Sequence, residues 1–429
     1  MNHPAPTQIS FSYALLGAIL VTLLLGGFIT NFLSFTELNM GTMVIDFLIG
    51  VLLMHTVVVV LSFYYSGKKV SLDYFAFAAF WCLLLLITIL KLSFIDTNPL
   101  REKVLGLRNT IFYASPLIYF PLLLRKSRHI DHSLASIVVI GVLLCLYAIF
   151  QFKFSSYLPL SFLALRGEGT FQFYDEEIVR PTALLGNTII FASFTITLFS
   201  ILLSKYVTTK KKVYLFYIAI IITANIFTYT RAALVGLLLS SGTIFFLHYG
   251  RFTLNFVLKF LAGCFLVIIS ILIVGYFNKD SFIVKRVTGQ EASTISSTTE
   301  HYNQIDNAIE YLKQNYLLGA GTGTQGPSSD TTRMIITDGY WFQLFLENGV
   351  FLGLFHLSLY LLCFYYALQT FFHSDDRLLR QLCLAFLGAS MYFFAGSFIN
   401  SALIGRINYI LYWVLFSLLL AQRLIINKR

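Results

Sequence analysis

The chain is dominated by long apolar stretches separated by short charged breaks. About 20 predominantly apolar residues are what an α-helix needs to cross the hydrocarbon core of a bilayer. Hydrophobic residues make up 57% of the 429 positions and charged residues 12%, whereas soluble domains carry about 25% charged residues. The mean hydropathy is +0.77. The sequence therefore predicts an all-α, polytopic membrane protein whose residues 1–429 form one integral membrane domain.

The apolar stretches and their charged boundaries predict about twelve transmembrane helices. These spans cover residues 11–33, 41–65, 73–95, 109–124, 133–152, 183–204, 213–229, 232–248, 252–276, 339–371, 381–400 and 407–424. The first stretch is too long for the apolar part of a cleaved signal peptide, and no basic segment precedes it, so we expect it to be the first span. The run 339–371 exceeds one crossing, so its helix is expected to tilt or to begin above the membrane.

Lysine and arginine are concentrated in alternate loops, and short basic loops face the cytoplasm. These loops contain Lys68, Lys69, Arg125, Lys126, Arg128, Lys205, Lys210, Lys211, Lys212, Arg251, Arg377, Arg380, Lys428 and Arg429. Both termini are therefore expected in the cytoplasm, and the intervening loops in the periplasm. One loop conflicts with this orientation, because residues 96–109 carry Arg101, Lys103 and Arg108 on the predicted outer side.

The largest predicted outer segment, residues 278–338, lies between the ninth and tenth spans. Within it, the three- and four-residue spacing of Ile305, Ile309, Leu312 and Tyr316 predicts an amphipathic helix over residues 298–316. The sequence GAGTGTQG follows at residues 319–326. A phosphate-binding loop is one interpretation, but no Lys-Ser/Thr pair follows it. A flexible turn after the helix is the interpretation we favour.

Arginines at the outer ends of spans are the chief candidates for function. They are Arg166, Arg180, Arg231, Arg333 and Arg406. The positive-inside bias disfavours arginine on the outer side, and a charge at membrane depth is costly unless it lines a polar cavity or meets an anion. The planar guanidinium suits two phosphate oxygens at once. The alternative for each is an interfacial anchor that reaches lipid phosphates.

Two of these arginines have distinctive neighbours. Arg231 lies in the sequence TYTRAA, between two apolar runs with almost no loop. Arg180 opens the sequence RPTALLGN, where Pro181 fits the first turn of the sixth helix. A helix N-terminus there would add positive potential beside the guanidinium, and both would favour an anion.

Two acidic residues lie where the chain re-enters the membrane. Asp338 ends the long outer segment, where it is either a general base for a hydroxyl group or a helix N-cap. Glu347 follows about two helical turns later, where it either pairs with an arginine or lines the cavity.

These stretches, in this order, resemble the O-antigen polymerase and ligase superfamily of bacterial membrane enzymes. The resemblance rests on residues 180–187, on residues 228–232, on residues 318–321 and on the aromatic, glutamate- and glycine-containing residues 340–353. In the second stretch Thr230 takes the place of the family's serine. The match covers about residues 180–355 and agrees with the number of spans.

The resemblance implies a GT-C-like, metal-independent, inverting glycosyltransferase of the inner membrane with a periplasmic active site. It would polymerise oligosaccharide repeat units on undecaprenyl diphosphate into O-antigen or a related polysaccharide, without a cofactor. The implied partners are the lipid-linked donor and acceptor glycans, membrane lipids and a polysaccharide chain-length regulator. Nucleic acid is not expected, because no basic, aromatic-interleaved stripe stands on a soluble domain.

The resemblance also implies site roles. Arg231 and Arg180 would stabilise the departing diphosphate, and Asp338 would act as the base or orient the acceptor, with His301 as an alternative base. Sugars or a second lipid phosphate would be held by Arg166, Arg333, Arg406 and Glu347.

Two alternatives to a polymerase remain. Ligases of the superfamily usually have histidine where Asp338 stands, which favours a polymerase over a ligase or a protein oligosaccharyltransferase. A lipid-linked oligosaccharide flippase would be expected to show internal repeats and broken or charged helices near the midplane. The unusual charges here gather at one predicted face, which favours an enzyme.

Overall fold

The computed structural model describes residues 11–32, 40–66, 71–163, 173–174, 178–250, 258, 292–325, 339–398, 402–403 and 406–427. The longer helices in these ranges are α1 (Phe11–Phe32), α2 (Met40–Tyr65), α3 (Leu72–Phe94), α4 (Leu100–Thr110), α5 (Pro116–Leu123), α6 (Ser127–Phe154), α8 (Thr188–Thr209), α9 (Val213–Phe227), α10 (Arg231–Tyr249), α13 (Ala292–Gln314), α14 (Tyr340–His373), α15 (Arg377–Gly396) and α16 (Arg406–Ile426). Short elements are the 3-10 turns η1 (Phe112–Ala114) and η2 (Ser155–Tyr157), helix α7 (Leu160–Leu163), and the strands β1 (Phe173–Tyr174) and β2 (Ile178–Val179), which pair antiparallel.

Most of the predicted spans coincide with one helix each. Within the described ranges, eight helices are long and apolar enough to cross a membrane, and shorter apolar helical stretches occupy Tyr13–Gly26 and Val213–Phe227. The all-α, polytopic membrane fold predicted from the sequence is therefore confirmed. The predicted span 252–276 falls almost entirely outside the described residues.

The predicted span 109–124 is wrong as a single helix. The end of α4, η1 and α5 share this stretch, and α5 begins with Pro116 at its first turn. Proline donates no amide hydrogen, which costs nothing in the first turn of a helix, so Pro116 suits the start of a new helix rather than the interior of one. A second proline, Pro121, lies inside the eight-residue α5.

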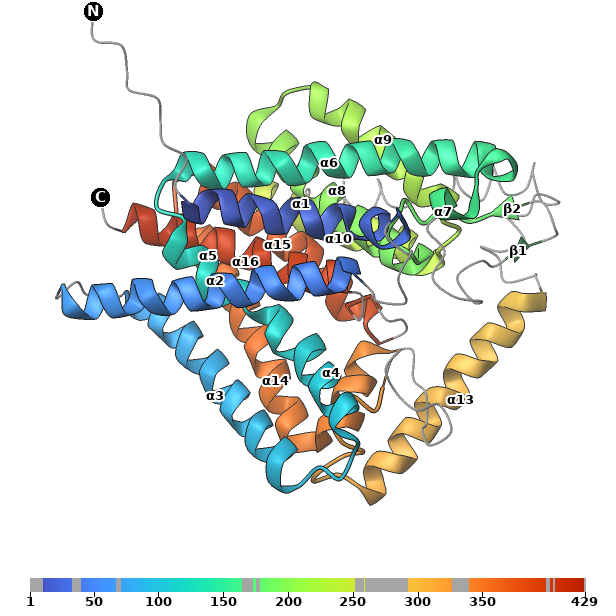
Figure 1. The fold of residues 1–429 in the computed structure, drawn as a ribbon. Helices are drawn as coiled ribbons and strands as arrows, with labels where there is room; N and C mark the ends of the chain where they lie inside the picture. Colours follow the sequence, from blue (N-terminus) through green and yellow to red (C-terminus); the bar gives the residue numbers. More distant parts are fainter. Residues whose placement is uncertain are drawn as a thin grey trace, which may run out of the picture.

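The centre of the molecule is formed by α8, α15 and α16, which are largely buried inside the bundle (Figure 1). Helices α10 and α14 pack against α15, and α9 packs against α8. By contrast, α2 and α3 expose large apolar side chains, including Phe47 at 68% and Met54 at 74%. Such an exposed apolar surface is unusual for a soluble protein and suits contact with lipid tails.

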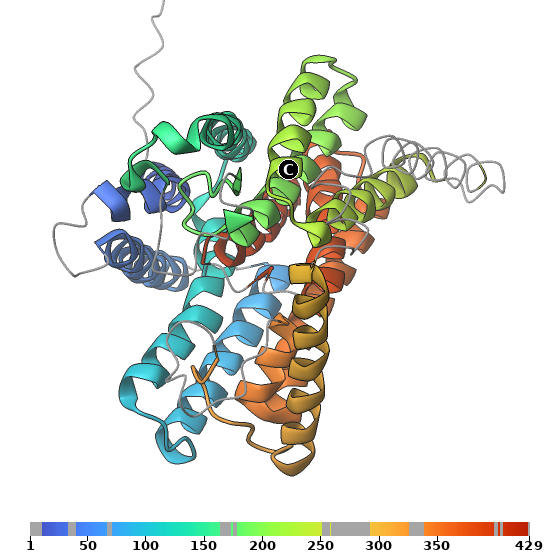
Figure 2. The ribbon, with the colours of Figure 1, turned by 90° about the vertical axis from the view of Figure 1, so that its right-hand side faces the viewer.

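Away from this centre, α3, α4, α14 and α13 form a corner of the molecule (Figure 2). Residues 319–325, called here the glycine loop, lie in this corner, and residues 321–325 are buried. The prediction of a flexible turn is therefore wrong, because the glycine loop is packed between helices. Gly323 lies so close to α4 that a Cβ atom there would be 2.0 Å from the carbonyl oxygen of Glu102.

The amphipathic helix predicted in the outer segment is α13, but its buried face differs from the predicted stripe. The face is centred on Ala308, which is fully buried, whereas Ile309 and Tyr316 are 40% and 52% exposed. Ile305 and Leu312 are partly buried on the same side as Ala308.

The conflicting charges in residues 96–109 have local partners. Lys103 Nζ donates hydrogen bonds to the carbonyl oxygens of Leu92 (3.0 Å) and Asp96 (2.5 Å). Arg108 forms an ion pair with Asp46 at 3.4 Å. These two cations therefore serve the packing of α3, α4 and α2.

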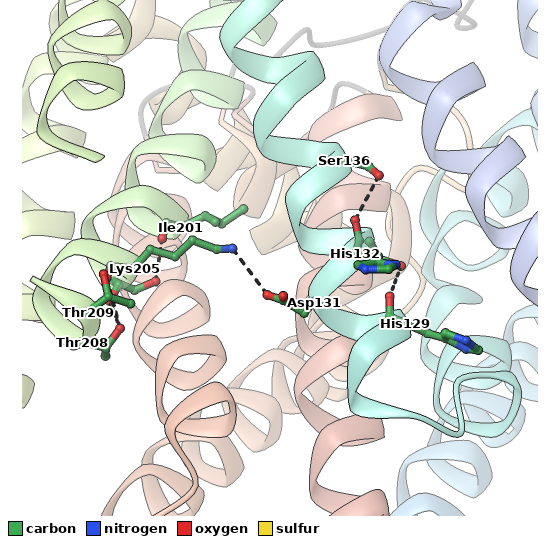
Figure 3. A network of polar contacts seen from close by, with 10 residues as sticks. His129, Asp131, His132, Ser136, Ile201, Lys205, Thr208 and Thr209 are labelled. Carbon is green, nitrogen blue, oxygen red and sulfur yellow. Dashed lines mark hydrogen bonds and ion pairs between the residues drawn. The ribbon is translucent and has the colours of Figure 1, made fainter. Parts of the chain in front are cut away.

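A separate polar contact joins α6 and α8 at the end of the bundle predicted to face the cytoplasm (Figure 3). Lys205 of α8 points toward Asp131 of α6, and the two charged groups lie 3.7 Å apart. The Lys205 side chain is 10% exposed and that of Asp131 is 58% exposed. An opposite charge is what a largely buried ammonium requires.

Substituting Gly323 tests the packing of the glycine loop. Gly323→Ala places a Cβ atom against Glu102 in a backbone conformation (φ +81°) that L-residues rarely adopt. We expect the free energy of unfolding to fall by about 2 kcal/mol or more, measured as a lower melting temperature in detergent. Gly50→Ala in α2 is the matched control, because nothing lies within 4 Å of the added Cβ atom. Equal melting temperatures for the two variants would contradict the close packing.

Candidate functional site

Arg180 is buried against the turn that joins α9 to α10. Its side chain is 7% exposed. Its Nε atom donates a hydrogen bond of 2.7 Å to the carbonyl oxygen of Thr228, and a terminal nitrogen donates one of 2.9 Å to the Thr230 hydroxyl. Thr230 directly precedes Arg231. The two arginines predicted to act together, 51 residues apart in the chain, are thus brought to the same turn.

The turn itself has a fixed conformation. Tyr229 adopts a left-handed backbone (φ 51°), which is uncommon for a residue with a bulky side chain. Thr228 is fully buried, and its hydroxyl donates to the carbonyl oxygen of Asn225 at 2.6 Å. Asn225 in turn donates to the Thr195 hydroxyl of α8 at 2.6 Å. Backbone strain of this kind persists only where the surroundings determine it, which is common at functional sites.

The approach to α8 differs from the prediction. The sixth span was expected to begin at residue 183 with Pro181 in its first turn, but α8 begins at Thr188. Asn187 is the N-cap, and its side chain accepts hydrogen bonds from the amides of Ile189 and Ile190. Asparagine is among the best N-cap residues, so the helix starts there. The first amides of α8 are therefore engaged by Asn187.

Before α8, the chain forms an irregular buried turn. Ala183 and Leu184 have positive φ angles of 48° and 68°. The side-chain oxygen of Gln151 in α6 accepts hydrogen bonds from the amides of Thr182 (2.9 Å) and Ala183 (3.0 Å). Gln151 also donates to the carbonyl oxygen of Leu163 at 3.2 Å. This buried glutamine holds the segment that carries Arg180.

Arg231 is the first residue of α10 and is exposed. Thr230 occupies the N-cap position without a side-chain cap hydrogen bond. Its hydroxyl instead accepts from Arg180 and donates to the carbonyl oxygen of Thr228 at 3.3 Å. An uncapped helix N-terminus carries positive potential and amide donors. With the guanidinium of Arg231 beside it, this end of α10 is suited to bind an anion.

Arg406 lies in a second polar cluster rather than at the α9–α10 turn. It is the first residue of α16 and interacts with Tyr113 and Asp46. Asp46 accepts a hydrogen bond of 2.9 Å from the Tyr113 hydroxyl and also pairs with Arg108. Asp46 thus pairs with Arg108 while Arg406 lies beside Tyr113, and two guanidinium groups with one carboxylate give the cluster a net positive charge.

Three of the predicted site residues, Arg166, Arg333 and the predicted base Asp338, lie outside the described residues. His301 is partly buried on α13. The start of the helix that follows Asp338 is anchored to α15, because the Trp341 indole nitrogen donates a hydrogen bond of 2.9 Å to the carbonyl oxygen of Phe394.

The prediction that Glu347 pairs with an arginine or lines the cavity is wrong within the described residues. Its side chain is 1% exposed, and its carboxylate accepts hydrogen bonds from the Gln325 amide (3.0 Å) and the Gln343 side chain (3.3 Å). The cation near Glu347 is Lys91 of α3, whose Nζ atom donates to the Glu347 carbonyl oxygen and which was not among the predicted site residues. A lysine inside an apolar span was the signal that could have identified it.

Within the described ranges, no group of three or more histidine, cysteine, aspartate or glutamate side chains is placed to hold a metal ion. At the α9–α10 turn the exposed charged group is the guanidinium of Arg231, so an anion such as a phosphate is the ligand that this chemistry fits.

Comparison with known protein families agrees with the sequence motifs. Residues 215–357 match the Wzy_C family, described as O-Antigen ligase. This segment is a third of the chain and includes α9, α10, α13, the glycine loop and the first half of α14. The predicted resemblance to the O-antigen polymerase and ligase superfamily is thereby confirmed, and the match does not distinguish a polymerase from a ligase. A comparison with curated proteins finds no match.

The family and the many apolar helices together indicate a multi-pass protein of the bacterial inner membrane.

The two arginines are expected to differ in their effect on stability. Arg180→Ala removes two hydrogen bonds, one to the Thr228 carbonyl oxygen and one to the Thr230 hydroxyl. We expect it to lower the free energy of unfolding by about 2–3 kcal/mol. Arg231→Ala, at an exposed position, is expected to leave the melting temperature unchanged. Equal melting temperatures for both variants in detergent would show that Arg180 does not hold the turn.

Proposed function

We propose that this protein is a membrane glycosyltransferase that polymerises undecaprenyl-diphosphate-linked oligosaccharide repeat units into O-antigen or a related surface polysaccharide. The observation that supports the proposal most is the contact of Arg180 with Thr230, which directly precedes Arg231 at the uncapped N-terminus of α10. The family match includes Arg231 and this helix. Lipid-linked glycans carry a diphosphate, which is the anion such a site would recognise.

In the proposed reaction, a sugar hydroxyl of the acceptor repeat unit attacks the anomeric carbon of the donor glycan. A new glycosidic bond forms, the bond to the diphosphate breaks, and the hydroxyl proton passes to a base. Because the reaction is a single displacement, the configuration at the anomeric carbon is inverted. Negative charge grows on the departing diphosphate, so preorganised cations would lower the barrier. Arg231 contributes the exposed guanidinium, and Arg180 holds the turn and adds positive potential. We propose that these groups make a metal ion unnecessary.

Asp338 is our proposed general base, since it directly precedes the anchored start of α14. His301 of α13 is the alternative base. We propose that Arg166 and Arg333 hold sugar groups, and that Arg406, in the cluster with Asp46 and Arg108, binds the phosphate of the second lipid. Two separate cationic clusters would suit a reaction in which both substrates are lipid-linked.

We further propose that the site faces the periplasm and that both termini are cytoplasmic. The short basic loops support this orientation. Helices α8, α10, α14 and α16 would then all begin at the outer face, which carries Arg180, Arg231 and Arg406 at one side of the membrane. Residues 278–338 would form the periplasmic segment above the single membrane domain.

A ligase is the second candidate, because the matching family is described as O-antigen ligase. A ligase would transfer a finished glycan to a different acceptor, whereas a polymerase extends it. Asp338 stands where ligases of the superfamily usually have histidine, and this supports the polymerase.

Deleting the gene and restoring it separates the two functions. In a gel of surface polysaccharide, the deletion is expected to collapse the ladder to a single repeat unit attached to the core. Loss of all attached glycan, with lipid-linked polymer accumulating, would instead identify a ligase. An unchanged ladder would contradict both functions for that polysaccharide.

Arg231 is expected to be essential for polymer formation. In the deletion strain, Arg231→Ala should yield no long chains while the protein is still inserted and folded. Arg231→Lys should restore little activity, because an ammonium group loses the two-pronged geometry of the guanidinium. Normal chain lengths with Arg231→Ala would contradict the proposed role, and full activity with Arg231→Lys would leave only a requirement for positive charge.

A further inference from the structure

Three segments that are distant in the sequence meet in the corner formed by α3, α4 and α14. They are the end of α3 with the residues that follow it, the glycine loop, and the first half of α14. Figure 2 shows α13 running beside α14 toward this corner. The glycine loop therefore connects α13 to α3, α4 and α14.

The helix α14 is interrupted at Gly349, whose φ of 73° and ψ of 175° are not helical. The glycine loop and the end of α13 use the backbone groups at this break. The Ala320 amide donates to the carbonyl oxygen of Leu346 at 2.6 Å, and the Val350 amide donates to the carbonyl oxygen of Tyr316 at 2.7 Å. A Cβ atom on Gly349 would lie 2.3 Å from the carbonyl oxygen of Leu317, so the close approach requires glycine.

Glu347 joins the break, the loop and α3. Its carboxylate accepts the hydrogen bond from the Gln325 amide at the end of the glycine loop. Its own carbonyl oxygen accepts a hydrogen bond of 2.5 Å from Lys91 Nζ. The Glu347 and Lys91 residues are 1% and 6% exposed. A buried ammonium is costly unless it is hydrogen-bonded, and Lys91 meets this need by fixing the backbone of α14 at Glu347, two residues before the break.

A second carboxylate fixes the middle of the same loop. Asp96, which follows α3, accepts a hydrogen bond of 2.9 Å from the Thr322 amide. The Asn98 side chain donates to the carbonyl oxygen of Ala320 at 3.2 Å. Three amides of the glycine loop, at residues 320, 322 and 325, are thus each held by a different partner.

We propose that Glu347 is a positioning residue that fastens the glycine loop to α14 and thereby fixes α13, which leads into this loop, while Lys91 holds the backbone of α14 at the same point. This inference rests on the proposed function. A carboxylate that is fully buried and already accepts two hydrogen bonds is not available to a sugar or a phosphate. It lies on the rigid helical stretch that begins at Tyr340, directly after the proposed base. Displacing a reacting group by about 1 Å can cost ~100-fold in rate.

The first measurement is hydrogen exchange of the purified full-length protein without substrate. Glu347→Ala is expected to speed exchange at the amides of residues 320, 322 and 325, because the loop loses its acceptor. Glu310→Ala, an exposed glutamate on α13, is the matched control and should leave these amides unchanged, as should Arg231→Ala. Unchanged exchange in Glu347→Ala would overturn the proposal.

The second measurement separates positioning from substrate binding in a polymerisation assay with lipid-linked repeat units. Glu347→Ala should lower kcat by ~10- to 100-fold with KM nearly unchanged, as expected for a misplaced reacting group. A raised KM with unchanged kcat would show that Glu347 binds substrate. Hydrogen exchange is measured without substrate, so it tests the loop contact even if the protein proves not to be a polymerase.

Variants that keep the volume of the side chains guard against misfolding. Glu347→Gln keeps an acceptor oxygen for the Gln325 amide and is expected to retain most of the kcat and the slow exchange that Glu347→Ala loses. Lys91→Met removes the donor to the Glu347 carbonyl oxygen and is expected to speed exchange at residue 325. Exchange in Glu347→Gln as fast as in Glu347→Ala would contradict the role of the acceptor oxygen.

Discussion

The structure depends on the contact between the glycine loop and the interrupted helix α14. A break in a membrane helix frees backbone amides and carbonyls that lipid cannot satisfy. Here the chain that ends the outer segment supplies the missing partners, through Ala320 and Tyr316. Two buried side chains act at the same point: Lys91 donates to the Glu347 carbonyl oxygen, and the Glu347 carboxylate accepts from the Gln325 amide. The outer segment is thereby joined directly to the helices of the membrane domain.

The candidate site, in contrast, contains a helix end whose first backbone amides have no side-chain cap. Thr230 directs its hydroxyl to Arg180 and to the preceding turn, so the N-terminus of α10 has no side-chain cap. Arg180 is buried and structural, whereas Arg231 is exposed and available. A site with one fixed and one accessible cation is suited to hold a diphosphate while charge develops on it. The second cluster, with Arg108 and Arg406, gives the same chemistry at another position.

The sequence predicted the long helices well, because apolar runs bounded by charges directly reflect the solvent they face. It also singled out Arg180 and Arg231 through their unusual place at span ends, and the structure brings Arg180 to the residue before Arg231. It failed where one polar residue decides a boundary, as at Asn187, which starts α8 later than expected. The contact of Lys91 with Glu347 joins residues 256 positions apart and follows only from tertiary packing. Proline in the run 109–124 was a local signal of a break that the apolar pattern concealed.

We propose that the cationic N-terminus of α10 binds the diphosphate from which a glycan is transferred. The direct test uses the purified protein in liposomes, supplied only with the undecaprenyl-diphosphate-linked repeat unit from its own cell. We expect a ladder of longer lipid-linked chains and the release of one undecaprenyl diphosphate for each new bond. A repeat unit that stays intact, with no chain growth and no released diphosphate, would contradict this proposal.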